Sequence, residues 1–147
     1  MTSSKHFALI GGAAMLGMGI ASFVPRLSVA PRKAGLPRLD IETSYGKFLG
    51  VFPLNIFNKV ALTLFGAAGV AVSQLESERP ARTYARAVAF AMAPLAILGA
   101  IPRTRTLFGK WPLFGAEVAA HGVFAALGAL AGFKSNGVRP KERRATR

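Results

Sequence analysis

The chain has 147 residues, a net charge of +13 and no cysteine, which fits one domain and excludes disulfides, thiolate metal sites and cysteine nucleophiles. Hydrophobic residues make up 52% of it, and they lie in continuous runs instead of recurring with a helical or strand period. The basic residues fall between these runs, not on one face with interleaved aromatics, which argues against nucleic-acid binding.

Four apolar runs predict four membrane-spanning helices, at about residues 7–25, 55–75, 84–102 and 112–133. Each run has the roughly 20 residues that a helix needs to cross about 30 Å of hydrocarbon. We therefore expect an all-α membrane protein, a four-transmembrane-helix bundle formed by residues 1–133. Residues 134–147 form a basic polar tail, which we expect to bind anionic lipid headgroups or an acidic partner.

The first run also resembles a signal peptide, because Lys5 gives a positive start and residues 28–30 resemble a cleavage site. Its length, and Pro31 directly after that site, favour a retained span. Four spans place both termini on one side of the membrane. That side carries slightly more basic residues than the other, so the positive-inside rule predicts cytoplasmic termini.

The chain shows signs of an internal duplication. Residues 49–54 and 108–113, before the second and fourth runs, share the pattern apolar, Gly, any, aromatic, Pro, Leu. Chance similarity between alanine-rich helices is the alternative. Two independently placed proline anchors favour a parallel duplication of a two-helix unit about an axis along the membrane normal.

The matches between the halves keep constant offsets along the chain. One offset relates the second run to the fourth and aligns Pro53 with Pro112. A larger offset relates the first run to the third and aligns Pro25 with Pro102, because the first loop is longer. We call this alignment of the two halves the repeat register.

The prolines suggest where the helices begin and end. We expect Pro53 and Pro112 to begin the second and fourth helices, in the first turn where a missing N–H has no cost. Pro25 and Pro102 should end the first and third helices. Pro94 lies inside the third run and should kink that helix.

Small residues at helical spacing predict the faces along which the helices pack, because small side chains let backbones approach closely in lipid. The predicted stripes are Ala13, Gly17 and Ala21; Gly66, Gly69 and Ser73; Ala85, Ala89 and Ala93; and Gly128 with Gly132.

Ionisable groups inside spans are costly and mark candidate functional sites. Glu117 and His121 are four residues apart and share a helix face. Lys59 and Glu117 follow Pro53 and Pro112 by similar distances, so they should lie at similar depth. We therefore predict a direct or water-bridged ion pair between Lys59 and Glu117. The alternative is that Lys59 extends to the headgroups on its own.

His121 is expected near the middle of the bilayer. It could bind a haem or chlorophyll-type ligand, take part in a proton relay, or hydrogen-bond a neighbouring helix. No catalytic set and no metal motif is visible in the sequence. We therefore predict that the protein is not an enzyme and that it has no dedicated metal site.

Residues 49–59 (LGVFPLNIFNK) and 112–121 (PLFGAEVAAH), together with 84–86 and 132–133, resemble a family of uncharacterised bacterial four-helix membrane proteins. The resemblance covers about residues 6–133 and implies a bacterial inner or internal membrane. Members usually have histidine at the positions of Asn58 and Leu62, facing an acid and a histidine at those of Glu117 and His121. The resemblance thus implies a polar cluster of which this chain keeps half, since Leu62 can neither ligate nor titrate.

The leading hypothesis is a non-enzymatic integral membrane protein that serves as an accessory or structural subunit of a larger membrane complex. The alternative is a cofactor-, metal- or proton-binding membrane protein that uses His121 and Glu117 with Asn58. A transporter ranks third, because no pair of broken helices points to a substrate site. The expected partners are the lipid bilayer, anionic headgroups and other membrane-protein subunits.

Overall fold

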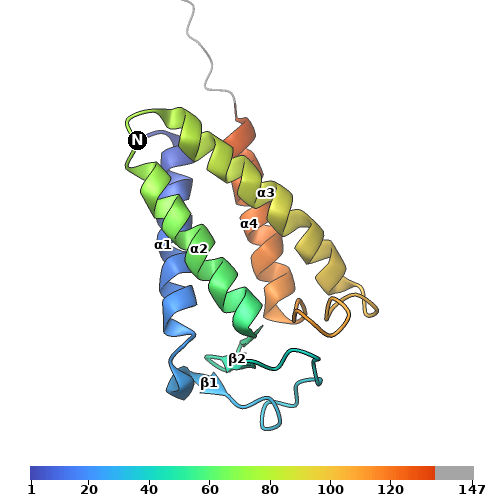
Figure 1. The fold of residues 1–147 in the computed structure, drawn as a ribbon. Helices are drawn as coiled ribbons and strands as arrows, with labels where there is room; N and C mark the ends of the chain where they lie inside the picture. Colours follow the sequence, from blue (N-terminus) through green and yellow to red (C-terminus); the bar gives the residue numbers. More distant parts are fainter. Residues whose placement is uncertain (135–147) are drawn as a thin grey trace, which may run out of the picture.

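The computed structural model describes residues 1–134. Four α-helices run alongside one another (Figure 1): α1 (Ser3–Ala21), α2 (Ile56–Ser73), α3 (Glu78–Ala100) and α4 (Ala116–Phe133). Successive helices run in opposite directions, so the N-terminus and the end of α4 lie at the same end of the bundle. A mostly helical fold with four helices is confirmed among the described residues. The predicted tail at 134–147 lies, apart from Lys134, outside the described residues.

Three helices, α2, α3 and α4, are long and apolar enough to cross a membrane. α1 has 19 residues, but its first turns hold Lys5 and His6, which lower its mean hydropathy. Large apolar side chains project from the helices to the outside, as lipid contact requires; the most exposed are Ile10, Leu64, Phe90, Ile97 and Leu130.

A small sheet that the sequence did not predict caps one end of the bundle. A 3₁₀ turn, η1 (Pro25–Leu27), leads into β1 (Ser28–Val29), which pairs antiparallel with β2 (Gly46–Phe48). β2 pairs antiparallel with β3 (Phe52–Leu54). Strands of two or three residues are too short to show an alternating pattern, so only their hydrogen bonds reveal them.

The prolines lie outside the helices that they were predicted to open. Pro53 is in β3, paired with Lys47, and Pro112 precedes α4 by four residues. Both are fully buried, so they pack in the interior just before the start of α2 and of α4. The helices begin instead at Asn55 and Gly115, which occupy the N-cap positions. Pro94 does lie inside α3, as predicted.

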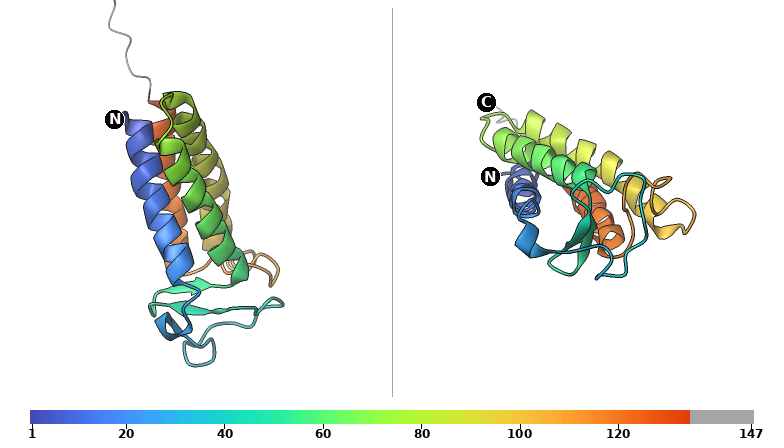
Figure 2. Two further views of the ribbon diagram at one scale, coloured as in Figure 1. Left: turned by 60° about the vertical axis from the view of Figure 1, so that its left-hand side comes forward. Right: turned by 60° about the horizontal axis from the view of Figure 1, so that its bottom comes forward.

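The helices pack most closely as two pairs, α1 with α2 and α3 with α4 (Figure 2). In the first pair, a methyl group added to Gly69 would come within 2.8 Å of the carbonyl oxygen of Ala8. In the second pair, one added to Gly128 would come within 2.8 Å of the carbonyl oxygen of Ala85. The repeat register aligns Gly69 with Gly128 and Ala8 with Ala85, so the two contacts are equivalent.

The predicted small-residue stripes are confirmed for α2 and α4 and for Ala85 and Ala89 in α3, all of which are buried. The prediction was wrong for α1. Its buried face carries Ala8, Gly12 and Gly19, whereas a methyl group added to Gly17 would meet nothing within 4 Å. Alanine and glycine recur so often in this helix that composition alone could not select the correct face.

The two loops below α2 and α4 also follow the repeat register. Leu49–Gly50 and Phe108–Gly109 are both in the left-handed region, with φ of 50° and 68° in the first pair and 56° and 82° in the second. Leu54 pairs with Gly46 across the first turn, and Leu113 N donates to Arg105 O at 2.8 Å across the second. A hairpin-like turn thus precedes each of these helices.

Candidate functional site

Asn58 is fixed at the start of α2 by a capping box. Its Oδ1 accepts a hydrogen bond from Asn55 N at 3.1 Å, and the Asn55 side chain caps the helix in return. Asn58 Nδ2 is left to donate outward, to Pro112 O and to Glu117 Oε2, both at 3.2 Å. A helix-capping residue therefore reaches across to the other half of the molecule.

Glu117 lies in the first turn of α4, where the helix dipole favours a negative charge. One turn later, His121 Nε2 lies 3.7 Å from Glu117 Oε2, close enough for an ion pair but longer than a hydrogen bond. Both residues are buried. The structure thus brings together all three residues predicted as a binding site, Asn58, Glu117 and His121.

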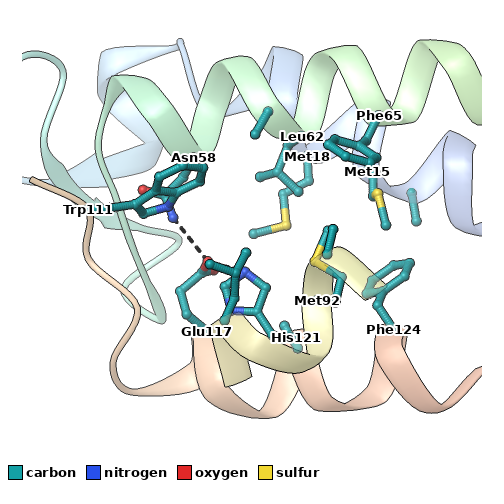
Figure 3. Close-up of a pocket in the computed structure, with 15 residues that line it drawn as sticks. Met15, Met18, Asn58, Leu62, Phe65, Met92, Trp111, Glu117, His121 and Phe124 are labelled. Carbon is teal, nitrogen blue, oxygen red and sulfur yellow. Dashed lines mark hydrogen bonds and ion pairs between the residues drawn. The ribbon is translucent and has the colours of Figure 1, made fainter. Parts of the chain in front are cut away.

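These residues border a cavity of about 220 Å³ between the four helices, here called the bundle cavity (Figure 3). Its wall is mostly apolar. The lining residues are Ala14, Met15, Met18, Asn58, Ala61, Leu62, Phe65, Ala91, Met92, Leu95, Trp111, Glu117, Ala120, His121 and Phe124. Seen along its length, the bundle cavity has one polar end, at Asn58 and Glu117, and one apolar end, at the two phenylalanines.

The lining follows the internal repeat. Apart from Trp111, every residue of the wall has a counterpart in the repeat register that also lines the cavity. Four pairs are identical in sequence, among them Met15 with Met92. The two pairs that differ in polarity are Asn58 with Glu117 and Leu62 with His121. These four positions are therefore where the two halves of an otherwise repeated wall differ in chemistry.

Two buried nitrogen atoms on this wall have no hydrogen-bond partner within the described residues, His121 Nδ1 and Trp111 Nε1. Buried polar groups are nearly always paired, and an unmet donor costs about 1–3 kcal/mol. Trp111 stacks on Phe57, with ring centroids 5.8 Å apart, which holds its indole in place. Sequence reasoning did not select Trp111 as a site residue, although it is the chain's single tryptophan and lies in the repeated loop pattern.

The direct ion pair predicted between Lys59 and Glu117 does not form. Lys59 Nζ donates instead to Ser44 Oγ at 2.8 Å and lies 5.7 Å from the ring centroid of Phe23. Among the described residues, the basic side chain within 4 Å of the Glu117 carboxylate is His121, and their contact is an ion pair only when the imidazole is protonated. The prediction matched the two residues by depth, but one position along a helix turns a side chain by about 100°: Asn58, not Lys59, faces Glu117.

The donor set does not fit a transition-metal site. Within residues 1–134, no three His, Cys, Asp or Glu side chains are grouped closely enough to hold a metal ion. Zinc and similar ions take three or four such ligands, and here Leu62 and Asn58 occupy two of the four places. What the arrangement offers instead is two nitrogens without hydrogen-bond partners, on residues that line a mostly apolar cavity.

Antiparallel helices that pack through small residues, expose large apolar side chains and bury a few polar groups together define a helical bundle of the membrane-protein class. The chain belongs to the family described as a domain of unknown function (DUF4383), whose model matches residues 5–134. The resemblance to an uncharacterised family is thereby confirmed. No curated protein and no solved structure matches the chain.

Proposed function

We propose that this chain is a four-span integral membrane protein whose bundle cavity binds a small, neutral, mostly apolar ligand with one hydrogen-bond acceptor. The observation that carries the proposal is the pair of unpartnered buried nitrogens, His121 Nδ1 and Trp111 Nε1, on residues of a mostly apolar wall. A ligand oxygen would satisfy the indole N–H, which can only donate. The protein would bind this ligand without chemical turnover, because no nucleophile among the described lining residues adjoins Glu117 and His121.

The size of the bundle cavity supports a ligand of one or two rings. Its volume is about 220 Å³, and an apolar cavity of about 150 Å³ in another protein stays dry and binds benzene. Sites for larger ligands usually span about 300–1,000 Å³. This comparison favours a small lipophile over a haem or chlorophyll-type macrocycle at His121.

The four-span arrangement is supported by the packing of α1. This helix has 19 residues, against 18 in α2, and lies along α2 over its length. Its charged and imidazole side chains, Lys5 and His6, stand at its start, where they can reach the headgroups. The paired contacts in the repeat register likewise support a parallel duplication of a two-helix unit. Four spans keep both termini on one side, and we assign that side to the cytoplasmic face of a bacterial inner or internal membrane.

The role of accessory subunit in a larger complex stays a prediction, and it is compatible with ligand binding. Gentle-detergent purification followed by mass spectrometry tests both. A co-purifying membrane protein supports the subunit role. A lipophile recovered in stoichiometric amount from the wild-type protein supports the binding role.

Binding can be tested directly with a matched pair of probes, acetophenone and ethylbenzene, which differ chiefly in one carbonyl acceptor. We expect acetophenone to bind about five-fold more tightly, because one hydrogen bond is worth about 1 kcal/mol. Ligand-observed NMR measures both affinities. In a Trp111→Phe variant, which keeps the ring stacked on Phe57, we expect the preference for acetophenone to disappear.

A cavity-filling variant separates binding in the bundle cavity from partition into detergent. Ala91→Leu adds bulk to the wall and should abolish saturable binding of both probes. Ala87→Leu, one turn earlier on the same helix and exposed, is the matched control and should bind as the wild type does. Equal binding by both variants would rule out the bundle cavity as the site.

A further inference from the structure

A second cavity lies at the capped end of the molecule, between the end of α1, the start of α2 and the small sheet, and we call it the loop cavity. Its volume is about 300 Å³. Phe23, Ser28, Val29, Ser44, Tyr45 and Lys59 are among its lining residues. Within the described part of the chain, it shares no residue with the bundle cavity.

Lys59 is the one charged side chain among the described residues that line the loop cavity. The residue is only 3% exposed, which is unusual for lysine. Its ammonium group can donate three hydrogen bonds, and Ser44 Oγ accepts one of them, at 2.8 Å. Among residues 1–134 no carboxylate forms an ion pair with it, and the Phe23 ring is its other electrostatic contact.

Ser28 supplies a second unmet group in the loop cavity. Its Oγ is buried and has no hydrogen-bond partner among the described residues. Gly46 in the neighbouring strand β2 has no side chain to contact it; a methyl group added there would come within 3.0 Å of Val29 O and 3.4 Å of Ser28 Cβ. A hydroxyl can donate to an anion that the Lys59 ammonium also contacts.

Tyr45 closes another side of the loop cavity as a neutral group. Its hydroxyl donates to Pro37 O at 3.1 Å. Burial, and secondarily the Glu42 carboxylate, raise the pKa of Tyr45 to about 12, so the hydroxyl stays protonated at physiological pH. Glu42 itself lines a neighbouring hollow and accepts from Leu39 N at 3.3 Å, so its carboxylate is not among the groups that line the loop cavity.

A buried cation with no counter-ion is costly, and an anion that meets its remaining N–H groups removes much of that cost. We propose that the loop cavity is an oxyanion site, in which Lys59, Ser44 and Ser28 hold a phosphate group. The phosphate would belong to a lipid headgroup or to free phosphate in solution. Phosphate suits this donor set because it accepts several hydrogen bonds at once.

The position of the loop cavity fits a headgroup. It lies at the end of α1 and the start of α2, at the bottom of Figure 1, where helices that cross a membrane would leave the hydrocarbon. The segment between these helices also carries more basic than acidic residues; the basic ones are Arg26, Arg32, Lys33, Arg38 and Lys47. Such a surface attracts anionic lipid.

Two titrations distinguish the two sources of phosphate. The full chain is purified in dodecyl maltoside, a detergent without phosphate, and either sodium phosphate is added at constant ionic strength or phosphatidylglycerol is mixed into the micelles. Thermal stability and native mass spectrometry are the readouts. Stabilisation by sodium phosphate alone identifies free phosphate as the ligand. Stabilisation by phosphatidylglycerol, with one lipid retained per chain, identifies a headgroup.

Lys59→Met should weaken the identified binding by about ten-fold or more, because it removes a charge-assisted hydrogen bond. Lys5→Met, at the opposite end of α1, is the control and should leave binding within about two-fold of wild type. Should Lys59→Met fail to fold, Ser28→Ala gives the same test, with a weaker but measurable loss.

The proposal is overturned if neither titration stabilises the wild type. It is also overturned if Lys59→Met or Ser28→Ala binds as well as Lys5→Met. None of these outcomes depends on the bundle cavity, so the probes of that cavity and of the loop cavity can fail independently.

Discussion

The two halves of the molecule, residues 3–73 and 78–133, share their packing but not their polarity. Gly69 against Ala8 and Gly128 against Ala85 are equivalent close contacts, and the turns that precede α2 and α4 repeat the same left-handed geometry. The polar groups of the bundle cavity are unevenly divided, because the second half supplies both of its titratable side chains. Backbone contact thus defines the shape of the bundle cavity, and two pairs of side chains define its chemistry.

Substitutions at the close helix contacts should have the largest effect on the packing that the two halves share. Gly69→Val and Gly128→Val should each destabilise the bundle by about 3 kcal/mol or more, because a side chain there meets backbone of the partner helix. Thermal unfolding in detergent measures both. Gly17→Ala, which meets nothing within 4 Å, is the control and should be neutral or slightly stabilising. A large loss in one half and none in the other would contradict equivalent packing.

The difference in polarity can be tested with a double-mutant cycle on Asn58 and Glu117. Asn58→Leu should cost about 1–3 kcal/mol, because it leaves a buried carboxylate without its amide donor. The double variant Asn58→Leu/Glu117→Leu should recover much of that loss, since both buried polar partners are gone. Denaturation of the wild type, both single variants and the double variant gives the coupling energy. Additive losses would show that the hydrogen bond carries no coupling.

The repeat register aligns Tyr45 in the loop of the first half with Thr104 in the loop of the second half. The two loops should therefore respond differently to alkaline pH. The pKa of Tyr45 is about 12 in the folded protein, because of burial first and Glu42 second, against about 10 in an unfolded chain. The folded state therefore holds the proton more tightly, and stability should fall as pH rises from about 10 to 12. Tyr45→Phe should flatten that dependence at a cost of about 1 kcal/mol; thermal unfolding against pH measures both.

The smallest effect is expected from exchanging the one apolar pair of the bundle cavity that differs between halves. Met18→Leu/Leu95→Met swaps the pair and conserves the total volume. Stability should change by less than about 1.5 kcal/mol, and acetophenone affinity should not change measurably. A marked loss of affinity would show that the two halves of the wall contact the ligand differently in shape as well as in polarity.

The helices were readable from the sequence because continuous apolar runs of about 20 residues have few other solutions. The contact between Asn58 and Glu117 could be predicted only in part. The repeat aligned the two positions, but their depth in the membrane favoured Lys59 as the partner of Glu117. The three short strands and the role of Trp111 were not readable. They depend on contacts between segments far apart in the chain, such as the hydrogen bond from Asn55 Nδ2 to the carbonyl just before Trp111, which no local period encodes.

The repeated wall of the bundle cavity has a consequence for how a guest would sit. A two-fold wall offers any guest two poses of nearly equal shape fit, related by a half-turn about the repeat axis. The exchange of Leu62 for its counterpart His121, with Trp111 on one side only, removes that degeneracy. The loss of polar groups from one half therefore makes one of the two ligand poses more favourable than the other, which a perfectly repeated cavity could not do.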